Sequence, residues 1–157
     1  MKNIRLVNYF ILLTTLLCSC KGCIRPKEPE FLRMQNINIL YNSNDSVIAV
    51  SEAVFFNPNK IGAIILNTEL NVHSNGIKVA DISQTNNAEA KPESEFILQV
   101  NYAIDLKKLL NSQGLSGLIS SALSRSCKLE FNGYCRIMVR EKIYKIPISS
   151  EQTINFN

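Results

Sequence analysis

The side chains with the widest chemical range in this sequence are five cysteines and one histidine, His73. Three of the cysteines lie near the start of the chain, and two, Cys127 and Cys135, lie near its end. A thiol can form a disulfide, bind a metal or be alkylated, and spacing decides which reaction is open to it. A structural zinc site needs about four cysteine or histidine ligands close together, so we expect no metal site.

The two late cysteines are predicted to be structural. Cys127 and Cys135 are eight residues apart in one strand-like run, so their Cα atoms should lie about 26 Å apart at about 3.3 Å per residue. A disulfide requires less than about 7 Å, so the two cannot pair within that strand. We expect Cys135 to pack as a small, buried apolar residue.

Residues 1–19 have the pattern of a secretory signal peptide. Lys2 and Arg5 supply positive charge, and residues 6–17 form an apolar stretch of about twelve residues. A membrane-spanning helix needs about twenty such residues, so this stretch is too short to span. We therefore predict a cleaved leader.

The segment Leu17-Cys18-Ser19-Cys20 resembles the lipobox of bacterial lipoproteins, in which a lipid alkylates the cysteine that follows a small residue. Cys20 fits this pattern, whereas Cys18 lacks the small residue before it and Cys23 lacks the upstream leucine. Several acyl chains, such as palmitate, anchor a protein durably where one alone is marginal. The alternative is an ordinary cleaved signal with incidental cysteines.

The rest of the chain divides into a tether and a domain. Residues 20–30 contain two prolines and alternating charges, which predict a tether without structure, and residues 31–157 suffice for one domain. The net charge of +4 is spread without a basic patch, so we expect no nucleic-acid partner. The expected partner is the membrane, through Cys20. Lys21 replaces the Asp that retains some lipoproteins at the inner membrane, which favours the outer membrane of the cell envelope.

Alternating apolar residues predict strands through most of the domain. Residues 31–41 and 46–56 form two such runs. A third run has its apolar residues on one parity: Ile64, Leu66, Leu70 and Val72. Asn75-Gly76 follows, and because both residues tolerate positive φ, the pair is typical of a type I′ hairpin.

A polar stretch and a helical pattern interrupt these strands. Residues 86–94 contain Pro92 and few apolar side chains, which we interpret as a loop. Helical spacing then appears after Asp105, a suitable N-cap, in Leu106, Leu109 and Leu110. Residues 118–123 suggest a second short helical piece.

Strand patterns flank this insertion, at residues 96–102 before it and at residues 129–139 and 143–148 after it. A parallel βαβ architecture would need more helices. About seven strands with one short helical insertion predict an all-β fold, a fibronectin-III- or immunoglobulin-like antiparallel β-sandwich.

Three stretches of the domain occur in a recognisable order. The first, Phe-Phe-Asn-Pro-Asn-Lys-Ile-Gly, covers residues 55–62, the second is the hairpin of residues 70–80, and the third is Phe131-Asn132-Gly133-Tyr134. Together they resemble the LEA type 2 family, also known as the WHy domain, over most of residues 31–156. A serine-rich insert at residues 111–126 departs from the family pattern. The resemblance implies a fibronectin-III-like sandwich and an association with desiccation and stress tolerance, and it implies no reaction.

The Asn-Pro-Asn corner also has a structural explanation. Pro58 fixes its own φ and pushes Asn57 toward extended geometry, which ends the strand. Asn57 and Asn59 can cap backbone groups through Asx-type hydrogen bonds, and Gly62 permits a turn that most residues resist. We interpret seven residues as defining the fold: Asn57, Pro58, Asn59, Gly62, Asn75, Gly76 and Gly133.

Catalysis finds little support in the sequence. There is no Gly-x-Ser-x-Gly elbow, no His-Glu-x-x-His motif and no glycine-rich phosphate loop. His73 alternates with polar residues, so we expect it on the surface. We therefore expect neither an enzyme nor a cofactor.

These observations favour a membrane-anchored, non-enzymatic LEA type 2 lipoprotein that serves in envelope stress protection or maintenance. One alternative is a lipid-handling module, with a cleft formed by four apolar residues that could equally be ordinary core: Leu115, Leu118, Ile119 and Leu123. A second alternative is an adhesin or assembly subunit, which would expose an apolar edge strand.

Overall fold

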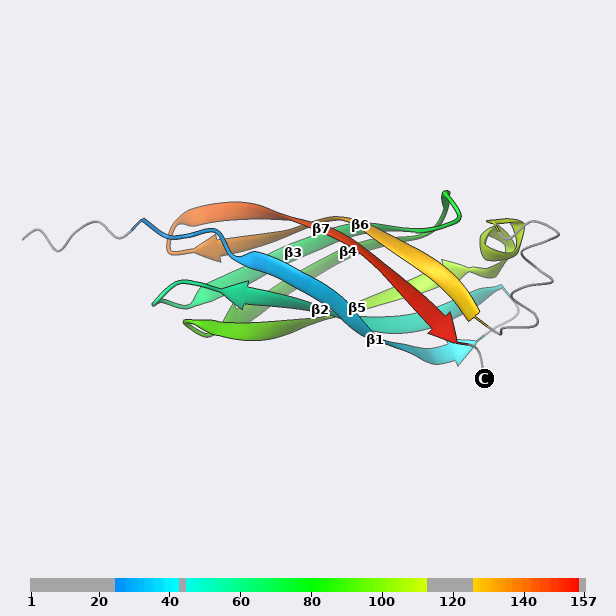
Figure 1. The fold of residues 1–157 in the computed structure, drawn as a ribbon, viewed down its shortest axis with the longest axis horizontal. Helices are drawn as coiled ribbons and strands as arrows, with labels where there is room; N and C mark the ends of the chain where they lie inside the picture. The colour runs from blue at the N-terminus through cyan, green and yellow to red at the C-terminus, as the bar shows by residue number, and fades with distance from the viewer. Residues whose placement is uncertain (1–24, 43–44, 113–125, 156–157) are drawn as a thin grey trace, which may run out of the picture.

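The computed structural model describes residues 25–42, 45–112 and 126–155 (Figure 1). They form seven strands, which run along the long axis of the molecule, and a short helix at residues 106–112. The strands are β1 (Glu30–Asn42), β2 (Ser46–Asn57), β3 (Ala63–Ser74), β4 (Ile77–Ala90), β5 (Ser94–Asp105), β6 (Ser126–Val139) and β7 (Lys142–Asn155).

The strands form two antiparallel sheets. One contains three strands in the order β1-β2-β5, and the other contains four in the order β4-β3-β6-β7. The predicted all-β sandwich of about seven strands with a helical insertion before the last hairpin is confirmed. Pro147 is tolerated in β7 because β7 is an edge strand, where a missing backbone N–H need not remove a ladder hydrogen bond.

Aromatic rings fill the core between the sheets. Phe55 lies edge-on to Phe31, with centroids 5.6 Å apart, and stacks on Phe96 at 5.4 Å. Tyr102 meets Phe131 of the other sheet edge-on at 5.7 Å. The strand predicted at residues 96–102 is present within β5, and its inward-facing residues are all buried: Phe96, Leu98, Val100 and Tyr102.

The parity predicted for β3 is wrong in its first half. Ile65 is buried and Ile64 is 37% exposed, whereas Leu70 and Val72 are buried as expected. Between Ile65 and Asn67 the register shifts against both neighbouring strands, which marks a β-bulge. A bulge adds one residue to a strand, so the alternation of side chains changes parity across it.

The loop predicted at residues 86–94 is also wrong. β4 continues to Ala90 and leaves only a three-residue turn, residues 91–93, before β5. One face of β4 meets solvent at the edge of its sheet, so polar residues are tolerated there. Asn86 Nδ2 donates to Thr68 Oγ1 (3.1 Å) and thereby joins β4 to β3. Pairing with β3 therefore overrides the weak strand propensity of this stretch.

The helix at residues 106–112 begins as predicted. The backbone N–H of Lys108 donates to Asp105 Oδ1 (3.1 Å), which makes Asp105 the N-cap, and this hydrogen bond is the main cause that lowers the Asp105 pKa. The second helical piece predicted at residues 118–123 lies outside the described residues. In the part of the chain that the structure describes, no helix is long and apolar enough to cross a membrane.

The elongated sandwich has two distinct ends (Figure 1). At one, which we name the linker end, residues 25–29 lead into β1 beside the β2–β3, β4–β5 and β6–β7 connections. At the other, the helix end, the β3–β4 hairpin lies with the helix, whose Leu106 N–H donates to the carbonyl of Asp45 just before β2 (3.1 Å). In Figure 1 the linker end is on the left and the helix end on the right.

Glutamine side chains bridge both sides of the sandwich. Gln84 of β4 donates through Nε2 to the carbonyl of Gln99 (2.9 Å) and accepts through Oε1 from the N–H of Asn101 (3.3 Å), both on the free edge of β5. On the other side, Gln152 of β7 donates to the carbonyl of Met34 in β1 (2.9 Å). These amides occupy backbone groups that an edge strand would otherwise offer to another chain.

Candidate functional site

The Asn-Pro-Asn corner is a buried polar cluster at the linker end. Asn57 is 0% exposed and Asn59 is 6% exposed. Asn57 Oδ1 accepts from the backbone N–H of Asn59 (3.1 Å) and from its Nδ2 (3.0 Å). Asn57 Nδ2 donates to the carbonyls of Ile61 (2.9 Å) and Lys91 (3.0 Å). The Asx-type bond expected of Asn57 is present, and the side chain also ties the β2–β3 loop to the β4–β5 turn.

Asn59 holds the segment that precedes β1. Its Oδ1 accepts from the backbone N–H of Lys27 (2.7 Å), and its Nδ2 donates to the Lys27 carbonyl (2.9 Å). The carboxamide therefore pairs with one residue's backbone as a neighbouring strand would. Tyr144 of β7 donates its hydroxyl to the Pro26 carbonyl, and Pro29 is buried. Residues 26–29 are thus docked on the sandwich.

This docking differs from the prediction of a tether without structure over residues 20–30, in the part of it that the structure describes. Residues 25–29 lack regular secondary structure, as the prolines predict. The backbone partner of Lys27, however, is a side chain 32 residues away, and a local pattern of prolines and charges contains no sign of it. Residues 20–24 lie outside the described residues.

Gly62 follows the corner, but its backbone does not require glycine, which corrects the prediction for this position. Among the described glycines only Gly76 has a positive φ. A Cβ added to Gly62 would lie 3.4 Å from the Ala90 carbonyl oxygen, an ordinary contact. Alanine therefore fits at position 62.

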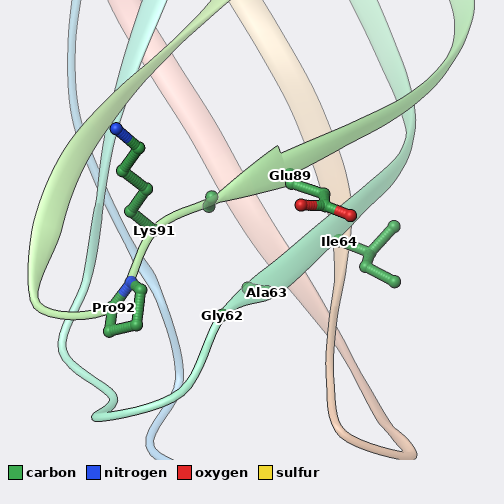
Figure 2. Close-up of a pocket in the computed structure, with 7 residues that line it drawn as sticks. Gly62, Ala63, Ile64, Glu89, Lys91 and Pro92 are labelled. Carbon is green, nitrogen blue, oxygen red and sulfur yellow. The ribbon is translucent and has the colours of Figure 1, made fainter.

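An open hollow of about 310 Å³ lies beside the corner, between the start of β3 and the end of β4. Figure 2 shows Ile64 and Glu89 side by side on these paired strands, with Pro92 on the turn beyond them and Lys91 pointing away from the pair. Covalent catalysis needs a nucleophile beside a base. The residues that line this hollow provide no such pair.

The predicted Asn75-Gly76 hairpin is confirmed at the helix end. Asn75 has a φ of 48° and Gly76 a φ of 78°, the positive values that a type I′ turn requires. Asn75 Nδ2 also donates to the carbonyl of Ser112 (3.1 Å), so the turn contacts the end of the helix.

Gly133 is needed for the close approach of β6 to β3. A Cβ at this position would lie 2.1 Å from the Glu69 carbonyl oxygen and 2.8 Å from the Leu70 Cα. Both are backbone atoms, so neither can move aside without shifting a strand. The sequence motif around Gly133 therefore has a structural cause.

A cluster that no local sequence pattern indicates lies on the outer face of the four-stranded sheet. The Tyr134 hydroxyl donates to the Glu69 carboxylate, while Lys145 Nζ lies 3.8 Å and the Arg136 guanidinium 5.3 Å from the ring centroid. The bond to Glu69 is the main cause that raises the Tyr134 pKa. Tyr134 lies opposite Glu69, and Arg136 opposite Lys145. Strand register would have been needed to find this cluster.

The thiol and phenol groups buried in the core are poorly reactive at neutral pH. Cys127 and Cys135 both lie buried in β6, as expected of Cys135. Burial raises the pKa of the Cys135 thiol to about 11, so it stays protonated and poorly nucleophilic at neutral pH. Burial likewise raises the pKa of Tyr102 to about 12, although its hydrogen bond to Ser51 Oγ (2.7 Å) opposes the shift.

His73 departs from its expected position on the open surface. It is half-buried, and its Nδ1 is buried with no hydrogen-bond partner among the described residues. In the same ranges no three acidic, cysteine or histidine side chains gather as metal ligands would. Six residues singled out from the sequence lie outside the described ranges, so their roles stay predictions: Cys20, Cys23, Leu115, Leu118, Ile119 and Leu123.

Solved structures share this fold. A protein from Arabidopsis thaliana, solved in solution, is 17% identical, with a TM-score of 0.67 over 84% of this chain and 84% of that one. A protein from Archaeoglobus fulgidus is 14% identical, with a TM-score of 0.57 over 82% of this chain and 98% of that one. An Arabidopsis structure described as a candidate late embryogenesis abundant (LEA) protein is 10% identical, with a TM-score of 0.56 over 99% of this chain and 85% of that one.

At these identities the likeness extends to the fold alone. A scan against models of protein families and a search of curated proteins gave no match. The neighbours therefore agree with the sandwich that the sequence predicts, and one of them bears a LEA description.

Proposed function

We propose that the protein is a lipid-anchored, non-enzymatic sandwich of the LEA type 2 kind that serves in stress protection or maintenance at the cell envelope. The observation that carries the proposal is the corner at the linker end. There the Asn-Pro-Asn motif, which suggested the family, binds the segment that follows the predicted lipidation site. The motif thus holds the chain close to the predicted anchor.

The use of the polar atoms supports a non-enzymatic role. Asn57 and Asn59 engage their side-chain oxygens and nitrogens in hydrogen bonds within the fold. Inside the core, Ser51 bonds to Tyr102 and Thr68 bonds to Cys135. Groups bound in this way stabilise one geometry and are not available to bind a substrate.

The edges of the sheets carry features for and against assembly by strand addition. The edge strand β1 exposes the apolar side chains of Leu32, Ile39 and Leu40, as that alternative expects, but its pairing is irregular. β1 carries three register shifts in its pairing with β2, and Asn36 within it has a φ of 52°. Bulges of this kind are a recognised protection of edge strands. Gln84 and Gln152 occupy further backbone groups on β5 and β1.

The anchor is tested by mass spectrometry of the full chain purified from the membranes of a Gram-negative host. We expect acyl chains on Cys20, loss of this mass in Cys20→Ala, and no loss in the matched control Cys18→Ala, whose substitution lies in the leader. An unmodified wild-type chain would overturn the lipoprotein assignment. A lipid retained non-covalently under native conditions would instead favour the lipid-handling alternative.

The protective role is tested in a source strain that lacks the gene. We expect survival after drying to fall, and to be restored by the wild-type gene and by Cys18→Ala but not by Cys20→Ala. Equal survival of the deleted and parent strains would refute a role in desiccation stress. Full rescue by Cys20→Ala would show that protection does not depend on the anchor.

A further inference from the structure

The docked residues 26–29 shorten the link between the predicted lipid anchor and the domain. Because the Pro26 and Lys27 backbones are bound to Tyr144 and Asn59, only residues 20–25 separate the predicted lipidation site from the docked segment. A fully extended chain spans at most about 3.6 Å per residue, so this linker reaches about 20 Å. A domain anchored through Cys20 would therefore hold its linker end within about 20 Å of the lipid.

The linker end carries more cations than carboxylates. Counted to five residues into each strand, its carboxylates are Glu28, Glu30, Glu89, Glu93, Glu95 and Glu141. Arg33 pairs with Glu95 (3.4 Å), and Lys142 Nζ lies 4.4 Å from the Tyr144 ring centroid. The cations are all exposed: Arg25, Lys27, Arg33, Lys60, Lys91, Arg136, Arg140, Lys142 and Lys145.

The helix end has the opposite arrangement. Each described cation there has a carboxylate partner: Lys78 with Asp81 (2.8 Å), Lys107 with Asp45 (3.5 Å), Lys108 with Asp105 (3.7 Å) and Lys128 with Glu151 (2.7 Å). Glu130 adds a further negative charge, and Arg125 lies outside the described residues. Counted to five residues into each strand, nine cations stand against six carboxylates at the linker end and four against five at the helix end. The sandwich is therefore electrically polar along its length.

We propose that the linker end binds an anionic membrane surface through its cationic turns, so that the sandwich stands end-on with its helix end away from the lipid. This inference rests on the proposed anchor at Cys20. A basic residue near an anionic surface gains about 1 kcal/mol, which is about fivefold in population, and this attraction falls off within about 10 Å. The short linker keeps the turns within about 20 Å of the lipid and so allows them to come within the range of this attraction.

An apolar side chain beside these cations fits the same surface. Ile143 follows Lys142 at the start of β7 and is 56% exposed. At a lipid interface such a side chain can leave water while the neighbouring Lys142 and Arg140 remain at the headgroups. The six carboxylates of the linker end oppose binding by its nine cations, so the net attraction is that of about three charges.

Lysine labelling on vesicles tests the orientation. The acylated full chain is reconstituted into phosphatidylcholine vesicles with or without 30 mole per cent phosphatidylglycerol and treated with a water-soluble acetylating ester. We expect the anionic lipid to slow labelling of Lys60, Lys91 and Lys142 at least threefold, and 0.5 M salt to abolish this protection. Labelling of Lys78, Lys107 and Lys128 at the helix end should not change.

Charge reversal provides the matched control. In Lys60→Glu/Lys91→Glu/Arg140→Glu we expect Lys142 to lose its protection, whereas Lys78→Glu/Lys107→Glu/Lys128→Glu should retain it. Equal labelling on both kinds of vesicle, with a chain that floats with the lipid, would overturn end-on binding and leave the anchor intact. A chain that does not float with vesicles would overturn the anchor and this inference together.

Discussion

The two ends of the sandwich are built by different interactions. At the linker end, buried carboxamides of Asn57 and Asn59 join three segments that are distant in sequence. At the helix end, local turn geometry at Asn75-Gly76 and exposed ion pairs predominate. Buried donors and acceptors must be satisfied, so they specify geometry strongly, whereas exposed charges remain solvated and specify it weakly. The linker end should therefore be the more sensitive to substitution.

Replacement of Asn57 should give the largest loss of stability. Asn57→Ala leaves the Ile61 carbonyl and the Asn59 N–H without their partner, at about 1–3 kcal/mol for each group, and it removes one of the two hydrogen bonds to the Lys91 carbonyl, which keeps that from Ser94 Oγ (3.1 Å). We expect the free energy of unfolding in urea to fall by about 3–5 kcal/mol. The control at the helix end, Asn75→Ala, should lose only about 1 kcal/mol. Equal losses of stability at the two positions would contradict the expectation that the linker end is the more sensitive to substitution.

Alkaline pH should destabilise the core through Tyr102 and leave the amides of the linker end untouched. The unfolded phenol has a pKa of about 10, and the buried one has a pKa of about 12. Between these values the unfolded chain has lost a proton that the native chain keeps, so stability falls as pH rises through this range. The difference amounts to about 3 kcal/mol at most.

Urea melts of wild type and Tyr102→Phe between pH 9 and 12 measure this effect. Phenylalanine cannot ionise, so the variant should lose less stability than the wild type over this interval, even if it is less stable at pH 8. Parallel pH profiles would mean that Tyr102 ionises normally in the folded protein.

Substitution of two glycines should distinguish the effect of a positive φ from that of side-chain contacts. Gly76→Ala at the helix end places a side chain at a φ of 78°, and we expect the unfolding free energy to fall by about 1 kcal/mol although the site is open. Gly62→Ala at the linker end should change it by less than about 0.5 kcal/mol, because its φ is ordinary. Thermal melts of the two variants suffice, and a larger loss for Gly62→Ala would show a strain there that its φ does not reveal.

The exposed ion pairs of the helix end should give the smallest effect. Lys128 Nζ lies 2.7 Å from Glu151, but both side chains are more than half exposed. Exposed pairs contribute about 0.2–1 kcal/mol, so we expect Lys128→Ala to change the unfolding free energy by less than about 0.5 kcal/mol. A double-mutant cycle with Glu151→Ala measures the pair, and a coupling above about 1 kcal/mol would remove the distinction between the two ends.

The helix end was largely predictable from sequence, and the linker end only in part. Asn75-Gly76 and Asp105 act on residues close to them in the chain, so local patterns identify them. The hydrogen bond between Asn59 and Lys27 joins residues 32 positions apart in the sequence. The alternation of apolar and polar residues identifies strands, but it does not show which distant residues come into contact. The bulge before Asn67 was missed for a related reason, because an extra residue is visible only against the strands that pair with it.

The glutamine bridges between the sheets have a consequence for a protein that loses its water. An exposed strand edge normally satisfies its amide and carbonyl groups with solvent, so drying leaves those groups to pair with whatever chain lies nearest. Gln84 and Gln152 satisfy the Gln99 and Met34 carbonyls and the Asn101 N–H with atoms of the same chain. These bonds persist when solvent is withdrawn, and the two sides of the sandwich stay closed to cross-β growth at those positions.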